Sequence, residues 1–301
     1  MNLIDLIGKY KPLIDVEVAT EMGRRLAEVG DISPELVKIV EMMRELAVGG
    51  KRMRGLLTIL GYKLAGGVLE GEGEVIKAAV VMELFHLGLL IHDDFMDQDN
   101  LRRGVETIQS RYSDRHIGES MAVLAGDYTF GWGVEILSSL NLSKDSVLKA
   151  MQVWGKYFTR VGYGQTLDVL KTADEKSLLS ILALKSGEYS CVLPLQLGAA
   201  LAGGNQEVMD KLYKYGMELG WVFQLRDDYL AEWGDSSKTG KPVGNDRRED
   251  KHSFALMYGK EKLLSEIERH VEQAKAVLRG YTLKDAGVLA EIVDWVAKRD
   301  N

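Results

Sequence analysis

The chain has 301 residues, 46% of them hydrophobic, and a formal net charge of −7. Its length allows one large domain or two ordinary ones, and its apolar content allows a sizeable buried core. The acidic balance argues against a nucleic-acid-binding protein. The single cysteine, Cys191, excludes an internal disulfide and suits a reducing compartment, so we expect a cytoplasmic protein.

The sequence predicts no segment that spans a membrane. The N-terminus lacks the basic start and apolar centre of a signal peptide. The apolar run at 78–91 contains Glu83 and His86 and falls short of the ~20 residues that cross a bilayer.

Apolar residues at helical spacing, only 4 prolines and no series of alternating strands predict an all-α fold. Because there is no internal repeat or linker, we expect 1–301 to be one domain. Ser33-Pro34 is typical of a helix start, and Gly49-Gly50 of a helix end. The expected helices are, in chain order, one after a mobile start within 1–30, then 33–47, 55–64, one from 74 into an acidic cluster, 119–140, 143–170, 174–202 with an interruption at 185–187, 206–230, and two between 260 and 299.

The acidic cluster follows the most apolar of these helices. Asp93, Asp94, Asp97 and Asp99 come directly after Ile91. At about 100° per residue, Asp93 and Asp97 share one helical face. Such clusters are usually solvated surface. The apolar helix before this cluster, and a second acidic pair after another apolar segment, favour a buried site instead.

Neighbouring carboxylates in a dry site need a counter-charge. Two or three Mg²⁺ ions would supply it, because hard cations choose carboxylate oxygens and leave positions for water or phosphate. The second pair, Asp227-Asp228, ends another apolar segment later in the chain. Arg102 and Arg103 suit the bound anion, since guanidinium groups match phosphate oxygens in pairs. An EF-hand is poorly supported, because the loop lacks the central glycine and the closing glutamate.

Three weaker patterns suit the same chemistry. Lys51 and Arg54 lie close together at a helix start that follows two glycines, where backbone amides favour an anion. The alternative is a solvated basic turn. Gln165 and Asp168 would share a helical face. Lys185 either lies inside the bundle at a kink or reaches solvent.

In this order the motifs resemble those of the trans-isoprenyl diphosphate synthases, the all-helical head-to-tail prenyltransferases that make geranylgeranyl and related diphosphates. The match covers 49–255, and the order of the motifs is more specific than any one of them. The motifs are Gly-Gly-Lys51-Arg-Met-Arg54, Asp93-Asp-Phe-Met-Asp97, Arg102-Arg103-Gly104, Ala-Gly-Asp127-Tyr, Gly-Gln165-Thr-Leu-Asp168, Lys185-Ser186, Phe-Gln224-Leu-Arg-Asp227-Asp228, Gly-Lys241-Pro and Asp246 to Lys251.

The resemblance implies the isoprenoid synthase fold, a bundle of long helices around a central cavity with both acidic motifs at its mouth, and a homodimer. It implies that Asp93 and Asp97 bind two Mg²⁺ ions and Asp227 a third. The substrate-binding and catalytic residues that it implies are Lys51, Arg54 and Arg103 for isopentenyl diphosphate, Arg102, Lys185 and Lys241 for an allylic diphosphate, Ser186 and Gln224 beside the reacting carbons, and Gln165 and Lys251 as further contacts.

The second acidic motif departs from the family pattern. The position of its usual third aspartate holds Ala231. Glu232 follows, but its carboxylate is turned by about 100° from the expected direction. We expect the metal site to survive, because Asp227 and Asp228 remain.

The helix before Asp93 is expected to set the length of the product. In the family, a bulky residue about five positions earlier blocks the growing tail, and here that residue is Gly88, so this block is absent. Phe85, about 4.5 Å deeper at 1.5 Å per residue, is predicted to form the floor. This favours a C20 product first and a C25 product second.

Two other functions stay open. A class I terpene cyclase shares the first motif and the fold, but the second acidic pair and the Lys241 loop disfavour it. A non-catalytic partner subunit of a heteromeric synthase is kept open by Ala231. In a synthase the released diphosphate can serve as the base, so His86 and His92 are expected to be structural or cavity-lining residues.

Overall fold

The protein is described by a computed structural model over residues 2–68, 72–171, 174–234, 253–279 and 286–300. Nearly every described element is helical, as predicted. The elements are α1 (Leu3–Gly30), α2 (Pro34–Ala47), α3 (Met53–Leu64), α4 (Glu72–Met96), β1 (Leu101–Arg102), β2 (Val105–Glu106), η2 (Gln109–Arg111), α5 (Arg115–Ser138), α6 (Lys144–Val169), α7 (Glu175–Ile181), η3 (Leu182–Val192), α8 (Leu193–Leu201), α9 (Gln206–Trp233), α12 (Phe254–Tyr258), α13 (Lys260–Leu278) and α14 (Ala286–Lys298).

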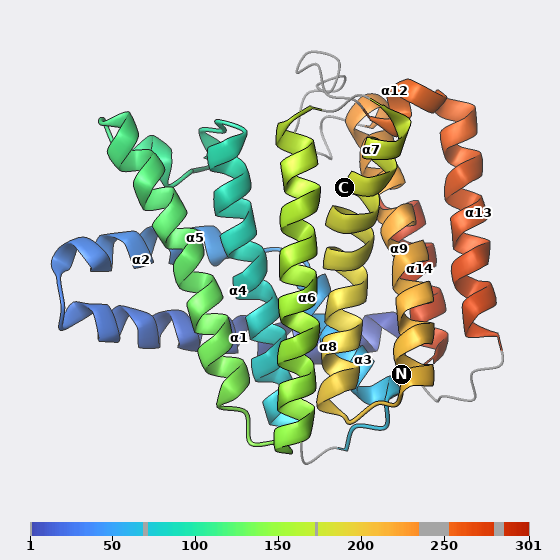
Figure 1. Ribbon diagram of the computed structural model, residues 1–301, viewed down its shortest axis with the longest axis horizontal. Helices are drawn as coiled ribbons and strands as arrows, with labels where there is room; N and C mark the ends of the chain where they lie inside the picture. Colours follow the sequence, from blue (N-terminus) through green and yellow to red (C-terminus); the bar gives the residue numbers. More distant parts are fainter. Residues whose placement is uncertain (1, 69–71, 172–173, 235–252, 280–285, 301) are drawn as a thin grey trace.

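Upright helices form the body of the molecule (Figure 1). Helices α4, α5, α6, α8 and α9 stand side by side, while α1 and α2 run across them and project beyond α5. Helices α13 and α14 cover the far side of α9. Buried apolar side chains from all of these helices join in one hydrophobic core.

The predicted cap of α2 is present. The side chain of Ser33 accepts a hydrogen bond from the Glu35 N–H at 3.2 Å, and Pro34 occupies the first turn. Gly49 and Gly50 follow the helix with φ of +85° and +86°, a conformation that glycine adopts without strain. The start of α1 differs from expectation: Asn2 caps it, so the helix already begins at Leu3.

Helices α3 and α8 cross at the centre of the bundle. A methyl group at Gly61 would overlap the backbone oxygen of Leu195, and one at Gly198 would overlap that of Thr58. The two helices therefore approach at backbone distance, which only residues without a side chain permit at these positions.

Replacing Gly61 with alanine is therefore expected to lower the free energy of unfolding by about 3 kcal/mol, since backbone atoms of Leu195 would have to move. Chemical denaturation measures this change. Gly131→Ala in α5 is the matched control, because nothing lies within 4 Å of the added carbon. The control is expected to be neutral or to gain ~1 kcal/mol from helix propensity. Equal unfolding midpoints for the two variants would contradict the close crossing.

The helix expected at 174–202 continues through its predicted interruption. It widens instead into a π-helix over the 11 residues of η3 and then proceeds as α8. Pro194, which lacks an N–H to donate, follows the wide turns directly. Widened turns are frequent at functional sites, and this one carries Lys185 and Ser186.

Two helical stretches, 72–96 and 175–201, are long and apolar enough to cross a membrane by length and composition alone. The length argument against a span therefore fails for these helices. Their burial carries more weight: 61% and 67% of their most apolar windows lie inside the fold, as for central helices of a bundle.

Candidate active site

One cavity of about 1290 Å³ brings the two acidic motifs together. Asp93 and Asp97 reach it from the end of α4, and Asp227 and Asp228 from the last turns of α9. The predicted meeting of two distant helix ends at one cavity is confirmed.

The first acidic motif lies where α4 ends. The Asp97 N–H donates to the Asp93 carbonyl at 2.8 Å, and the chain then turns into the β1–β2 hairpin. This hairpin returns Arg102 to Asp94, whose carboxylate is 1% exposed and accepts from the guanidinium Nε at 2.7 Å. Burial raises the pKa of Asp94 although Arg102 opposes the shift. Arg102 is thus anchored by the acid between the two predicted metal ligands.

Lys185 lies inside the bundle, between two acids of different helices. Its ammonium is 3.3 Å from Asp93 and 2.5 Å from Asp168. Burial opposes the charged form, but both carboxylates favour it and the pKa of Lys185 is raised. A charged lysine therefore stands beside the first acidic motif, and Asp168, a weak candidate in the sequence, has a defined partner.

A chain of hydrogen bonds joins η3 to the second acidic motif. The Ser186 hydroxyl donates to the Gln224 side-chain oxygen at 2.6 Å, and the Gln224 amide donates to Asp228 at 2.7 Å. The other Asp228 oxygen accepts from the Phe254 N–H at 2.8 Å. Ser186 and Gln224 both line the cavity, as the resemblance implies, and Asp228 orients them.

The basic residues near the start of α3 lie on one side of this cavity. Arg54 lines it and donates to the Ser190 hydroxyl at 2.8 Å, while its buried Nε has no hydrogen-bond partner. Lys51 lies 5.0 Å from the centre of the Trp295 ring. Lys51, Arg102 and Arg103 are not among the described residues that line the cavity.

Asp227 has a partner that sequence reasoning missed. The carboxylate, still 44% exposed, forms an ion pair with Arg299, which follows the last helix of the chain. Burial of the surroundings raises the pKa of Asp227, and Arg299 opposes the shift. No motif singles out Arg299, because it lies among ordinary charged residues near the C-terminus.

Aromatic side chains form the deep wall of the cavity. Phe130 of α5 and Phe158 of α6 both line it, with ring centres 4.5 Å apart. Phe85, the predicted floor, is not among the described lining residues. Its buried ring packs behind the wall, 5.5 Å from Phe130 and 5.2 Å from Phe158. Phe85 therefore lies behind the side chains that form the floor and is not itself part of the floor.

Helix α4 carries no bulky side chain at Gly88, as the sequence indicates, but the position is not open space. A methyl group at Gly88 would overlap the Thr129 hydroxyl and lie 3.0 Å from the Phe130 ring. The missing side chain allows α5 to approach α4, and Thr129 and Phe130 of α5 occupy the space beside Gly88.

Both histidines of α4 line the cavity. His86 Nδ1 lies 2.8 Å from the Tyr189 hydroxyl, and His92 Nε2 lies 3.0 Å from the Val123 carbonyl oxygen. Burial, with nearby arginines, holds the pKa of His86 well below its usual value. A neutral, hydrogen-bonded His86 agrees with the expected structural role.

The remaining predicted residues divide into two groups. Gln165 and Ala231 line the cavity, and Glu232 is 7% exposed, so it is not simply a solvated acid. Lys241 and Lys251 lie outside the described residues.

The donor set suits magnesium ions that complete their coordination with water or with substrate oxygens. Among the described residues, no three His, Cys, Asp or Glu side chains are grouped closely enough to hold a metal by themselves. Mg²⁺ commonly takes one or two carboxylates and completes its shell with water and phosphate oxygens. Asp93, Asp97 and Asp227 offer such carboxylates around a cavity that is also lined by Arg54, whose buried Nε has no hydrogen-bond partner.

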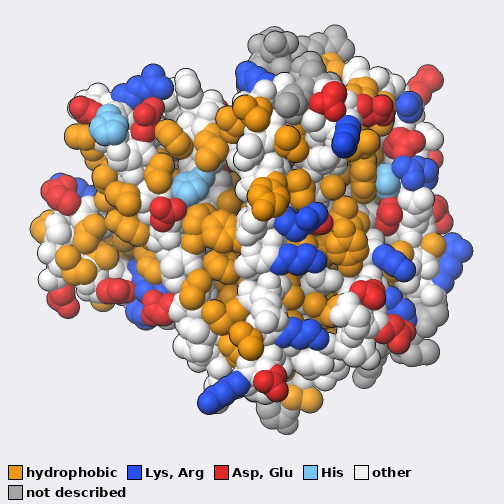
Figure 2. Space-filling model, viewed as in Figure 1, with side chains coloured by type: hydrophobic (Ala, Val, Ile, Leu, Met, Phe, Trp, Pro, Cys, Tyr) orange, Lys and Arg blue, Asp and Glu red, His pale blue; other side chains and the backbone are white. Residues whose placement is uncertain are grey.

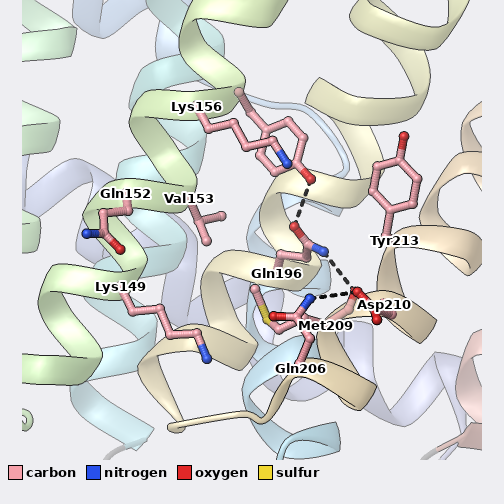
Figure 3. A pocket seen from close by; sticks show the side chains of 10 residues that line it. Lys149, Gln152, Val153, Lys156, Gln196, Gln206, Met209, Asp210 and Tyr213 are labelled. Carbon is pink, nitrogen blue, oxygen red and sulfur yellow. Dashed lines mark hydrogen bonds between the residues drawn. The ribbon is translucent and has the colours of Figure 1, made fainter.

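A second cavity of about 470 Å³ lies between α6, α8 and α9 (Figure 3). It contains none of the predicted site residues. Its buried polar groups satisfy one another: the Tyr157 hydroxyl donates to Gln196, and the Gln196 amide donates to the Met209 carbonyl, each at 2.8 Å. Lys149 and Lys156 stand at its edge.

Comparison with known proteins identifies the family, since the polyprenyl synthetase family model matches residues 37–287. The chain belongs to the polyprenyl synthetase family. It is a trans-prenyltransferase, as the order of the motifs predicts. The relatives and the structure described below are isoprenyl diphosphate synthases by name, and none of them is a terpene cyclase.

Relatives and solved structures give this polyprenyl synthetase its context. A geranylfarnesyl diphosphate synthase of Aeropyrum pernix is 34% identical over 72% of this chain and 68% of its own length. A geranylgeranyl diphosphate synthase of Methanosarcina mazei is also 34% identical, over 80% of this chain and 74% of its own. Across eight curated relatives, the aligned part spans 63–85% of the relative.

The crystal structure of geranylgeranyl pyrophosphate synthase from Corynebacterium glutamicum, complexed with isoprenyl diphosphate and magnesium, has a TM-score of 0.87 and 25% identity to this chain. The match covers 99% of this chain and 100% of that one. The predicted isoprenoid synthase fold is confirmed.

Proposed function

We propose that this polyprenyl synthetase condenses isopentenyl diphosphate with an allylic diphosphate, head to tail, with C20 geranylgeranyl diphosphate as main product and a C25 product second. The observation that carries the proposal is that the two acidic motifs line one cavity with an aromatic deep wall. The similarity to geranylgeranyl and geranylfarnesyl diphosphate synthases supports the range of products.

The metal is proposed to be Mg²⁺, two or three ions per site, held by Asp93, Asp97 and Asp227 together with substrate phosphates. When bound, these ions would draw charge from the leaving diphosphate. Lys185, a charged group beside Asp93, would stabilise the negative charge on the oxygens of the same leaving diphosphate. Arg102, anchored on Asp94, faces the same anion with the rest of its guanidinium N–H groups.

In the proposed reaction, the allylic C–O bond breaks and its electron pair leaves with the diphosphate. The double bond of isopentenyl diphosphate attacks the resulting carbocation, and a proton then passes to the released diphosphate. Phe130, Phe158 and Tyr189 line the deeper wall and exclude water that would quench the cation. Ser186 and Gln224, held through Asp228, are placed beside the reacting carbons.

Isopentenyl diphosphate is proposed to bind on the side of Arg54. The unpartnered, buried Nε of Arg54 is a donor that a phosphate oxygen would satisfy. Lys51 and Arg103 are the further cations proposed for this site. The Lys51 pKa is lowered by burial and by Arg299, which an incoming polyanion would offset.

Replacing Phe130 with alanine is expected to lengthen the product by at least one isoprene unit, because the ring fills the cavity at the level of Gly88. Phe85→Ala alone is expected to change the spectrum less, since Phe130 and Phe158 still stand before it. Chromatographic sizing of the dephosphorylated products measures both variants. Phe95→Ala, an aromatic loss outside the described cavity lining, is the control. Longer products from Phe85→Ala but not from Phe130→Ala would restore the original prediction for Phe85.

The protein is further proposed to be a cytoplasmic homodimer. Helix α5 presents exposed apolar side chains, among them Val123, Leu124 and Val134. Figure 2 shows hydrophobic side chains gathered over the part of this face where α5 lies. Light scattering on the purified protein tests the dimer, and a monomer at all concentrations would refute it.

The reaction is tested by incubating the purified protein with Mg²⁺, isopentenyl diphosphate and, in turn, C5, C10 and C15 primers. The expected result is condensation with at least one primer and a mainly C20 product. No condensation with any primer, together with stimulation of another synthase, would favour the non-catalytic partner subunit. Cyclic hydrocarbons formed without isopentenyl diphosphate would favour the terpene cyclase.

A further inference from the structure

The ion pair between Asp227 and Arg299 occupies the carboxylate that the second acidic motif would offer to a metal. Arg299 is not a loose surface residue in this contact, since its side chain is 9% exposed. Its guanidinium also donates to the Phe223 carbonyl at 3.2 Å and lies 4.2 Å from the centre of the Phe223 ring. One side chain is thus fixed on α9 by three separate contacts.

The C-terminal end of α14 packs against α9, and this packing brings Arg299 to Asp227. The Arg226 Nε donates to the Arg299 carbonyl at 2.8 Å, and Arg226 lies 3.7 Å from the Asp300 carboxylate. One turn earlier, Trp295 packs its ring against the ammonium of Lys51. The C-terminal turn therefore connects the second acidic motif with the basic start of α3.

Arg299 still has an unused donor in this arrangement. Its Nε is buried and has no hydrogen-bond partner. The Nε of Arg54, another group that acts electrostatically on Asp227, is in the same state. Buried N–H groups are rarely left unsatisfied, so two of them around one carboxylate point to an absent oxygen-rich ligand.

The charge balance differs between the two acidic motifs. Asp227 is surrounded by Lys51, Arg54 and Arg299, and the oxygens of Asp228 already accept from Gln224 and Phe254. Among the described residues, three cations therefore act on the single carboxylate of Asp227. A divalent ion bound at Asp227 alone would be repelled by these cations, which is unfavourable in a partly buried site.

The first motif places four carboxylates close together. Among the described residues, Arg102 pairs with Asp94 and Asp99, and Lys185 pairs with Asp93. A divalent ion at the first motif would reduce the repulsion among its carboxylates, so its binding does not require a negatively charged substrate as a further ligand.

We propose that Arg299 is the counter-ion of Asp227 in the metal-free protein, and that a divalent metal must displace Arg299 in order to bind Asp227. Metal binding at the second motif therefore requires a substrate diphosphate, whereas metal binding at the first motif does not. The displaced guanidinium would then donate to that diphosphate, which also supplies the oxygens that its Nε lacks. This proposal rests on the proposed role of Asp227 as a metal ligand.

The test counts bound Mn²⁺ by electron paramagnetic resonance on the full-length protein without any diphosphate. Wild type is expected to bind Mn²⁺ only at the first motif. Arg299→Gln is expected to bind one more ion per chain, or to bind at the second motif about tenfold more tightly, because a charge-assisted pair no longer competes. The double variant Arg299→Gln with Asp227→Asn is expected to lose this gain.

Arg226→Gln is the matched control, because it removes a contact of the same C-terminal turn and leaves the Asp227 pair in place. It is expected to bind Mn²⁺ like wild type. Thermal unfolding checks each variant, and Arg299→Ala replaces Arg299→Gln if that variant does not fold. Adding an unreactive thio-analogue of the allylic diphosphate, with a protein-free blank for its own Mn²⁺ binding, is expected to raise the wild-type count to that of Arg299→Gln.

Equal counts and affinities for wild type and Arg299→Gln, in protein that condenses its substrates with Mg²⁺, would overturn this inference and leave the proposed function standing. A gain that persists after Asp227→Asn would also overturn it, because the ion would lie elsewhere. Absence of Mn²⁺ binding in every variant, with and without the allylic thio-analogue, would refute the metal role of both motifs and the inference with it.

Discussion

Replacing Asp93 with asparagine is expected to lower kcat/KM for condensation about a thousandfold, since a metal carboxylate lost from the leaving-group site removes several kcal/mol of transition-state stabilisation. Asp93 lines the cavity, and its carboxylate lies 3.3 Å from the Lys185 ammonium. Asparagine keeps the size of the side chain and loses its charge. Steady-state kinetics with an allylic primer measures the change, and raising Mg²⁺ is expected to recover part of the loss.

Asp127→Asn is the matched control for this substitution. Asp127 belongs to a motif of the resemblance, but its side chain is 58% exposed on α5 and it is not among the described cavity-lining residues. We expect kcat/KM within a fewfold of wild type. If Asp93→Asn keeps activity within tenfold of wild type, the first acidic motif does not hold the metal.

Replacing Lys185 with glutamine is expected to lower kcat about a hundredfold, the usual effect of losing one preorganised charge beside a leaving group. The substitution also leaves Asp93 and Asp168 facing each other without the ammonium that joins them. The KM for the allylic diphosphate is expected to rise as well, because Lys185 contacts the diphosphate in the ground state too. Separate measurement of kcat and KM distinguishes the two effects.

The control for this lysine is Lys156→Gln, at the edge of the second cavity (Figure 3). It removes the same charge from the neighbouring α6 and should leave both constants unchanged. A Lys185→Gln enzyme with altered KM but normal kcat would limit Lys185 to substrate binding.

The meeting of the two acidic motifs could be predicted from the sequence. Each acidic motif follows a long apolar segment. Because such a helix buries most of its length, the charged residues at its end must lie at a cavity or at the surface. Asp93 and Asp227 also belong to motifs whose order is specific to one family. The boundaries of α4 and α9 follow from apolar spacing, which the structure reproduces within three residues of the predicted ends.

The floor of the cavity could not be predicted in the same way. Gly88 looks like an empty position along its own helix, but its space is taken by Thr129 and Phe130 of α5. Which side chain faces a glycine depends on how two helices cross, and helical periodicity gives no information on that crossing. For the same reason, the sequence did not indicate that Phe130 and Phe158 stand between Phe85 and the cavity.

Arg299 and the π-helix were missed for different reasons. Arg299 acquires its role through the docking of α14 on α9, a contact between residues 72 positions apart in the chain. The interruption expected at 185–187 was inferred from Gly187, whereas the backbone continues there with wider turns. Glycine in an apolar helix also serves close packing, and a methyl group at Gly187 would lie 2.9 Å from the Met217 sulfur.

The proposal that both acidic motifs bind one diphosphate through metal ions is tested most directly by a crystal structure with Mn²⁺, isopentenyl diphosphate and an unreactive thio-analogue of the allylic substrate. Anomalous scattering locates the Mn²⁺ ions. We expect ions at Asp93 and Asp97 and another at Asp227, all contacting the diphosphate of the allylic analogue. An analogue bound through one motif only, with no ion between its diphosphate and Asp227, would contradict the proposed mechanism.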